Sequence, residues 1–62
     1  MQEEQKIPFG RKEAARRLGV SVVTVDRLLA KEKLAHFKIG TRVLFNQELI
    51  NNFIQANIRQ AK

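Results

Sequence analysis

The side chains best suited to recognising another molecule lie between Ser21 and Lys31. Arginine can donate two hydrogen bonds to guanine, threonine can bond a base or a phosphate, and valine can contact a thymine methyl group. If this segment is a helix, its outward face can reach base edges in a DNA major groove. The predicted base-reading residues are Ser21, Val23, Thr24 and Arg27, with Lys31 at the end of the same segment.

Each of these residues also has a structural interpretation. Thr24 could make a capping contact in the first turn of the helix. Arg27 could pair with Asp26 or Glu32, or be solvated. Asp26 is unusual on a helix that meets DNA. It could orient Arg27, accept a hydrogen bond from cytosine, or mark the edge of the contact surface.

A second group of side chains is suited to phosphate. Lys12, Arg16 and Arg17 precede the segment and are predicted to contact the DNA backbone, where they carry little sequence information. Lys38, Thr41 and Arg42 follow it, and we expect them to reach a neighbouring minor groove, whose width a guanidinium can sense.

The charge distribution agrees with a binding surface for nucleic acid. The chain has 62 residues and a formal net charge of +6. Residues 11–42 hold nine Lys and Arg against three Asp and Glu, so this segment carries the whole excess. One positive face is typical of proteins that bind phosphate backbones. A solubilising coat of lysine and arginine is the alternative.

Catalytic and metal-binding patterns are absent from the sequence. His36 is the single histidine and there is no cysteine, so a metal site is not expected. Ser21, Thr24 and Thr41 lack a plausible base partner, and there is no Gly-rich phosphate loop. We therefore expect a protein that is not an enzyme and uses no cofactor.

Two short helices joined by a tight turn must position the base-reading residues. Ala14, Ala15 and Leu18 are spaced as the inner face of a helix over 11–18, and Val25, Leu28 and Leu29 as that of a helix over 22–31. Between them, Gly19 can take the left-handed conformation that ends a helix, Val20 is expected to point inward, and Ser21 is a favoured N-cap. This pattern predicts a helix-turn-helix.

A period of two from His36 to Phe45 predicts a β-hairpin. A two-residue turn would place Ile39 opposite Arg42 and split the apolar residues between two faces. A three-residue loop, 40–42, places Ile39 opposite Val43 and Phe37 opposite Phe45, so that all four are buried. We predict the second register, with Lys38 and Leu44 facing outward.

A third helix is predicted over 47–59, with Asn46 as its N-cap. Its apolar face would be Ile50, Phe53, Ile54 and Ile58. The four phenylalanines of the chain are expected in the core rather than stacked on bases. The domain should span 9–59, with a flexible tail over 1–8 and a C-terminal tail over 60–62.

Taken together, these residues resemble the excisionase-type branch of the MerR-like winged helix-turn-helix domains. The resemblance covers residues 9–55 and departs from the family pattern in two places. Glu32-Lys33 stands where the family usually has glycine, and Leu44 where it often has a basic or polar residue. The matching pieces are Lys12-Glu13-Ala14-Ala15, Leu18-Gly19-Val20-Ser21, Thr24-Val25, Arg27-Leu28, Leu34, Lys38-Ile39-Gly40, Arg42, and Glu48 with Phe53-Ile54.

The resemblance implies a mainly α fold with a small hairpin, the wing, and a function on double-stranded DNA. Small members of the family resemble excisionases of phages and other mobile elements, which bind and bend DNA beside a recombinase site. An integrase would then be a partner, with several copies of the chain on adjacent sites. The absence of cysteine and of a membrane-spanning apolar run favours a cytoplasmic location, and the resemblance implies that it is of a bacterial or phage type. The alternatives are a transcriptional regulator with the same contacts, and a protein-interaction adaptor that uses the outer wing and Leu44.

Overall fold

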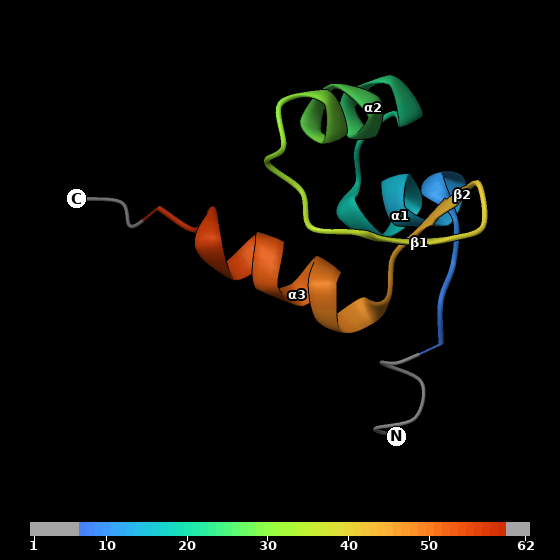
Figure 1. Cartoon of the computed structure of the whole chain (residues 1–62). Helices are drawn as coiled ribbons and strands as arrows, with labels where there is room; N and C mark the ends of the chain where they lie inside the picture. The colour runs from blue at the N-terminus through green and yellow to red at the C-terminus, as the bar shows by residue number, and fades with distance from the viewer. Residues whose placement is uncertain (1–6, 60–62) are drawn as a thin grey trace.

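The computed structural model describes residues 7–59, which form three helices and one two-stranded antiparallel hairpin. The elements in chain order are α1 (Arg11–Leu18), α2 (Val22–Ala30), β1 (Phe37–Ile39), β2 (Arg42–Leu44) and α3 (Gln47–Ala56). α1 packs against α2 and α3, and the hairpin, called the wing below (residues 37–44), lies beside the start of α1 (Figure 1). The predicted winged helix-turn-helix is confirmed. Of the two predicted tails, only Ile7 and Pro8 belong to the described residues.

The turn between α1 and α2 forms as its local sequence predicts, except at Val20. Gly19 has a φ of 74°, and its N–H donates to the carbonyl of Arg16 at 3.2 Å. The Ser21 hydroxyl accepts the Thr24 N–H at 3.2 Å and so caps α2. The prediction that Val20 points inward is wrong, because this residue is 39% exposed. Its backbone N–H, bonded to the Ala15 carbonyl at 3.0 Å, closes the end of α1 instead.

α2 ends in the same kind of turn as α1, but without a glycine. It ends at Ala30, one residue before the predicted end, and Lys31 is its C-cap. The N–H groups of Glu32 and Lys33 donate to the carbonyls of Leu29 and Leu28 at 3.0 and 2.9 Å, which is the Schellman pattern. Glu32 therefore has a φ of 56°, a conformation that is strained for a residue with a Cβ.

We expect Glu32→Gly to stabilise the protein, because glycine adopts a positive φ without the Cβ clash. The free energy of unfolding should rise by about 1 kcal/mol, as measured by urea denaturation. Lys33→Gly is the matched control: its φ is not positive, so glycine there can only add freedom to the unfolded chain. Equal destabilisation by both substitutions would contradict this role for Glu32.

The predicted register of the wing is wrong by one residue. Ile39 pairs with Arg42 and Phe37 with Leu44, so the loop has two residues, Gly40 and Thr41. Gly40 has a φ of 64° and Thr41 has no positive φ, which fits a type II′ turn with glycine first. The backbone of this turn matches the twist of paired strands. The two-residue loop therefore forms, although the three-residue loop would have placed all four apolar side chains on one buried face.

A contact outside the hairpin also fixes this register. Phe45 is bridged to Phe9 by two backbone hydrogen bonds of 2.8 Å, so it does not pair with Phe37. Alternation along the strand then places Leu44 opposite Phe37, on the face away from Val43. Leu44 is only 8% exposed, whereas Ile39 near the tip is 58% exposed. The prediction that Leu44 faces outward is therefore wrong, and the adaptor hypothesis loses its apolar contact there.

The core lies where the three helices meet the base of the wing. Phe45 and Ile50 are completely buried at its centre, and Phe9 and Phe53 pack on it while remaining partly exposed. Phe37, predicted to be buried with them, lies outside this cluster because of the register of the wing. The fully or nearly fully buried members of the cluster are Ala14, Ala15, Val25, Leu34, Phe45 and Ile50.

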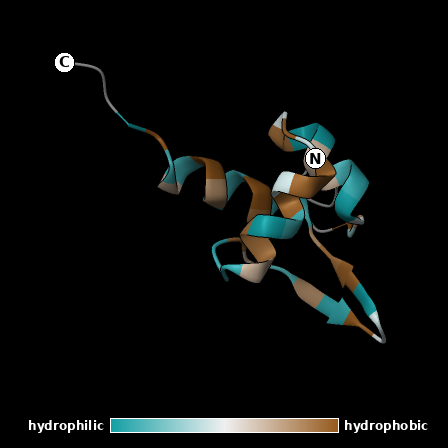
Figure 2. Cartoon of the chain, turned by 90° about the horizontal axis from the view of Figure 1, so that it is seen from above, coloured by the Kyte–Doolittle hydropathy of each residue, from teal (hydrophilic) through white to brown (hydrophobic). Residues whose placement is uncertain are grey.

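α3 is shorter than predicted and its apolar face is only partly buried. Asn46 caps it through a 2.9 Å bond from the Leu49 N–H, as predicted, but the helix ends at Ala56 instead of Arg59. Ile54 and Ile58 are 41% and 58% exposed, so they do not extend the core. The reason is visible in Figure 2: the C-terminal part of α3 projects away from the other helices, on the side opposite the wing.

Candidate nucleic-acid interface

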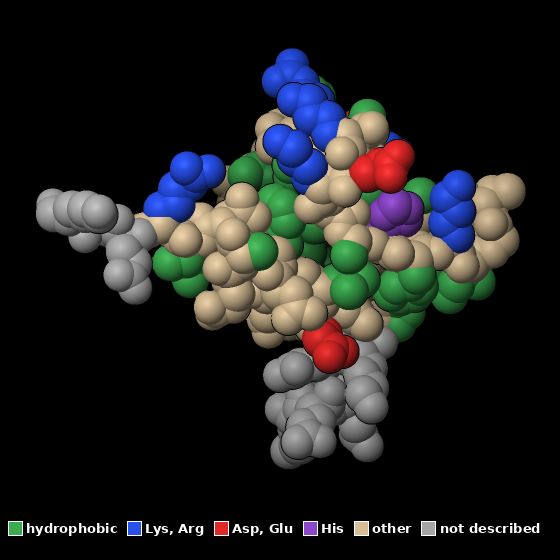
Figure 3. Space-filling model, turned by 60° about the vertical axis from the view of Figure 1, so that its left-hand side comes forward, with side chains coloured by type: hydrophobic (Ala, Val, Ile, Leu, Met, Phe, Trp, Pro, Cys, Tyr) green, Lys and Arg blue, Asp and Glu red, His purple; other side chains and the backbone are tan. Residues whose placement is uncertain are grey.

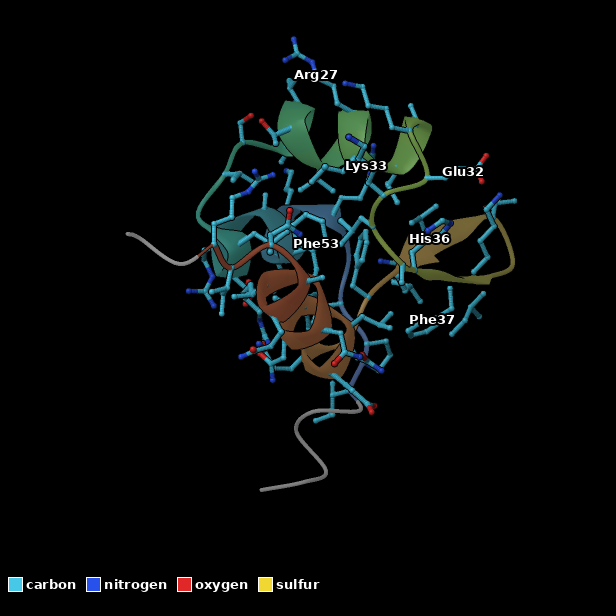
Figure 4. The ribbon with its side chains drawn as sticks, turned by 90° about the vertical axis from the view of Figure 1, so that its left-hand side faces the viewer. Arg27, Glu32, Lys33, His36, Phe37 and Phe53 are labelled. Atoms are coloured by element: carbon cyan, nitrogen blue, oxygen red, sulfur yellow. The ribbon has the colours of Figure 1, made fainter. Side chains whose placement is uncertain are left out.

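α2 presents one outward strip of side chains that the rest of the described chain leaves uncovered. Val23, Arg27 and Lys31 are exposed and follow one another at steps of four residues. Arg27 points away from the body of the molecule (Figure 4), and Lys and Arg side chains gather at the edge of the molecule formed by α2 (Figure 3). This is the surface that the sequence predicted for DNA, and it is apolar at its start and cationic toward its end.

Ser21 and Thr24 are bonded to each other at the start of this strip. Their hydroxyl oxygens are 3.1 Å apart, and the Ser21 oxygen also accepts the Thr24 N–H. Thr24 is partly buried, whereas Val23 beside it is 58% exposed. The capping interpretation of this pair is therefore correct, and base contact by either hydroxyl stays a prediction.

The Arg27 guanidinium makes no ion pair within residues 7–59, so the proposed pairs with Asp26 and Glu32 do not form. Asp26 pairs instead with Arg11, across the interface of α1 and α2, with 2.7 Å between the Arg11 Nη1 and Asp26 Oδ1 atoms. Arg11 was not among the predicted site residues. Because the two residues are 15 positions apart, no spacing within one helix could reveal their contact.

The three cations of α1 that are predicted to contact phosphate divide into two sets. Lys12 and Arg16 lie one turn apart on an exposed flank, with the Arg16 side chain 72% exposed. Arg17 lies on the other flank, where its guanidinium is 4.1 Å from the centre of the Phe9 ring and donates to the Gln47 side chain at 2.8 Å. Arg17 thus joins α1 to the start of α3, and its predicted phosphate contact would come in addition to this link.

Glu13 holds the two arginines Arg16 and Arg17 together. Its carboxylate accepts hydrogen bonds from the Nε atoms of Arg16 and Arg17 at 3.0 and 2.7 Å, and a further bond from Arg16 Nη2. These bonds lower the pKa of Glu13 from an ordinary value near 4.5 to about 2, and they raise the pKa of Arg16. The network therefore stays charged over the physiological pH range.

We expect the contribution of Glu13 to stability to depend on pH. Because folding lowers its pKa, the contribution is complete above about pH 4.5 and is lost as the pH falls toward about 2. Glu13→Gln should lower Tm near neutral pH, and the difference from the parent should shrink as the solution is acidified. Because the side chains are exposed, added salt should also reduce the difference in Tm between Glu13→Gln and the parent. A difference in Tm that did not change with pH would contradict this role.

The wing places its two cations on opposite faces. Lys38 lies opposite Val43, whereas Arg42 lies opposite Ile39, and side chains alternate along each strand. Both residues, and Thr41 in the turn, are exposed. Thr41, Arg42 and Val43 line a groove beside α1 together with Arg11 and Lys12, and Lys38 does not line it. The wing residues predicted for a minor groove are therefore available to solvent, but they do not act from one surface.

Other kinds of site find little support. The His36 Nδ1 atom is 3.2 Å from the Leu34 carbonyl oxygen, and its ring is tilted against that of Phe45. In the described part of the chain, no three metal-ligating side chains come together. Over the same residues, no helix is both long and apolar enough to cross a membrane.

Comparison with known protein families identifies the domain. A family model described as a helix-turn-helix domain matches residues 9–58, which includes every helix and strand of the structure. No curated protein and no solved structure matches the chain.

Proposed function

Because the chain belongs to the family of helix-turn-helix domains, which bind DNA, we propose that it acts as an excisionase. It would bind double-stranded DNA beside the attachment sites of a mobile element, bend it, and favour excision by a recombinase. The observation that supports this proposal best is the uncovered strip of α2 with Arg27 and Lys31, flanked by an exposed wing. The location would be the cytoplasm, on DNA.

Each predicted contact has a place in this proposal. α2 lies in a major groove, where Ser21, Val23 and Arg27 meet base edges and Thr24 bonds a base or a phosphate. Lys12, Arg16, Arg17 and Lys31 neutralise phosphates on either side. The wing follows the backbone toward the neighbouring minor groove through Lys38, Thr41 and Arg42.

The small size of the domain implies that it acts in several copies. A single module of this kind buries about 600–1,000 Å² on DNA, which gives modest specificity. Copies on adjacent sites, or one copy beside an integrase, would add their contacts. Bending a short site costs roughly 1–6 kcal/mol, which the phosphate contacts of several copies can offset.

The test is an excision assay with a recombinase and its attachment sites, with and without the protein. We expect excision to rise with protein concentration, and gel shifts with circularly permuted fragments to show a bend at the attachment site. A duplex of scrambled sequence and equal length is the control. Tight binding to an upstream operator without any effect on excision would contradict the excisionase role and favour a transcriptional regulator.

A further inference from the structure

A groove of about 590 Å³ opens between the start of α1, one edge of α2 and the tip of the wing. Arg11 and Lys12 line it from α1, and Arg42 lines it from the opposite side. Glu13 also borders the groove, but its carboxylate is bonded to Arg16 and Arg17. Three cationic residues from two elements therefore line one open space. The positive charge of these residues suits a chain of phosphates.

The groove continues directly from the outward strip of α2. Successive residues of an α-helix are about 100° apart, so Val22, Asp26 and Leu29 form an edge next to the strip of Val23 and Arg27. Val22 and Leu29 line the groove. When α2 lies in a DNA major groove, two sugar-phosphate strands border that major groove. One of these two strands would then lie against the groove of the protein.

The Arg11–Asp26 ion pair lies at this junction. Both side chains are about half exposed, and Arg11 uses one terminal nitrogen for the 2.7 Å contact. The guanidinium has further N–H donors, which can bind a phosphate oxygen while Asp26 holds the group in place. This arrangement also gives a reason for a carboxylate on a helix that meets DNA, because Arg11 neutralises it.

We propose that this groove binds one sugar-phosphate strand of DNA through Arg11, Lys12 and Arg42, and that Asp26 is the positioning residue for Arg11. The proposal rests on the placement of α2 in the major groove described above. Backbone contacts do not depend on base sequence, so a duplex of arbitrary sequence is a sufficient probe.

The first test compares Arg11→Gln with the parent in fluorescence anisotropy titrations of such a duplex over a series of salt concentrations. Losing one phosphate contact should weaken binding about tenfold at low salt and reduce the slope of log K against log salt by about 1. Arg59→Gln is the matched control, because it removes the same charge from an exposed position beyond α3 and should leave the slope unchanged. Circular dichroism checks that both variants fold.

An unchanged slope in Arg11→Gln, or an equal change in Arg59→Gln, would overturn the assignment of the groove. Either result would leave the parent's binding intact, so it is distinguishable from failure of the proposed function. Absence of salt-dependent binding by the parent itself would overturn both.

The second test addresses Asp26 through its coupling to Arg11. In an Asp26→Ala background the guanidinium is no longer held, so adding Arg11→Gln should cost only about twofold in affinity instead of about tenfold. An Asp26→Asn background separates positioning from neutralisation, because the amide oxygen can still accept the Arg11 hydrogen bond without a charge, and there Arg11→Gln should still cost about tenfold. If Arg11→Gln costs the same tenfold in the parent and in the Asp26→Ala background, then Asp26 does not position Arg11.

Discussion

Replacing Arg27 with alanine should strongly reduce the preference of the protein for its target sequence while leaving its fold intact. The side chain is exposed, points away from the body of the molecule and makes no ion pair within residues 7–59 (Figure 4). A bidentate contact between arginine and guanine is worth about 1–3 kcal/mol of discrimination against the wrong base, or roughly a factor of 5 to 150.

The measurement requires a target, which can be selected from random duplexes with the parent protein. Arg27→Ala and the parent are then titrated on the selected duplex and on random DNA. Arg16→Ala is the comparison, because a phosphate contact should weaken binding to both duplexes similarly. If Arg27→Ala discriminates between the two as well as the parent, Arg27 does not read bases.

The second large effect concerns stability. Phe45 is completely buried, and its backbone is bridged to Phe9, so Phe45→Ala would leave a cavity where the wing meets the helices. Such substitutions cost about 3–5 kcal/mol. At typical values per residue, a domain of 62 residues has only about 3–9 kcal/mol of total stability. We expect Phe45→Ala to be largely unfolded at 37 °C.

Urea denaturation followed by circular dichroism tests this expectation. Ile39→Ala is the control within the same hairpin, since Ile39 is a large apolar residue that lies mostly in solvent. It should shift the midpoint little. A Phe45→Ala variant with the midpoint of the parent would show that the wing is not part of the cooperative core.

The features predicted correctly from sequence depend on residues close together in the chain. Gly19, Ser21 and Asn46 fix the ends of helices through hydrogen bonds that span three to five residues. The exposed position of Arg27 follows from the helical period once Val25 and Leu28 face inward. The order of elements and the outward strip of α2 were therefore available from local patterns.

The features that were wrong or missed depend on residues far apart. The register of the wing depends on the bridge of Phe45 to Phe9, and the role of Asp26 on its contact with Arg11. The link from Arg17 to Gln47 spans 30 residues. Ile54 and Ile58 have the spacing of a buried face, but α3 extends past the elements that could cover them, as Figure 2 shows. The spacing of apolar residues shows which of them share one face of a helix. It does not show whether another element packs against that face.

The central claim is that α2 meets DNA with the wing beside it. The most direct measurement is an NMR titration of the ¹⁵N-labelled protein with its selected duplex. We expect the largest amide shifts over 22–31 and in the wing at Thr41 and Arg42, with little change at the end of α3. Shifts confined to α3, with α2 and the wing unaffected, would contradict the claim.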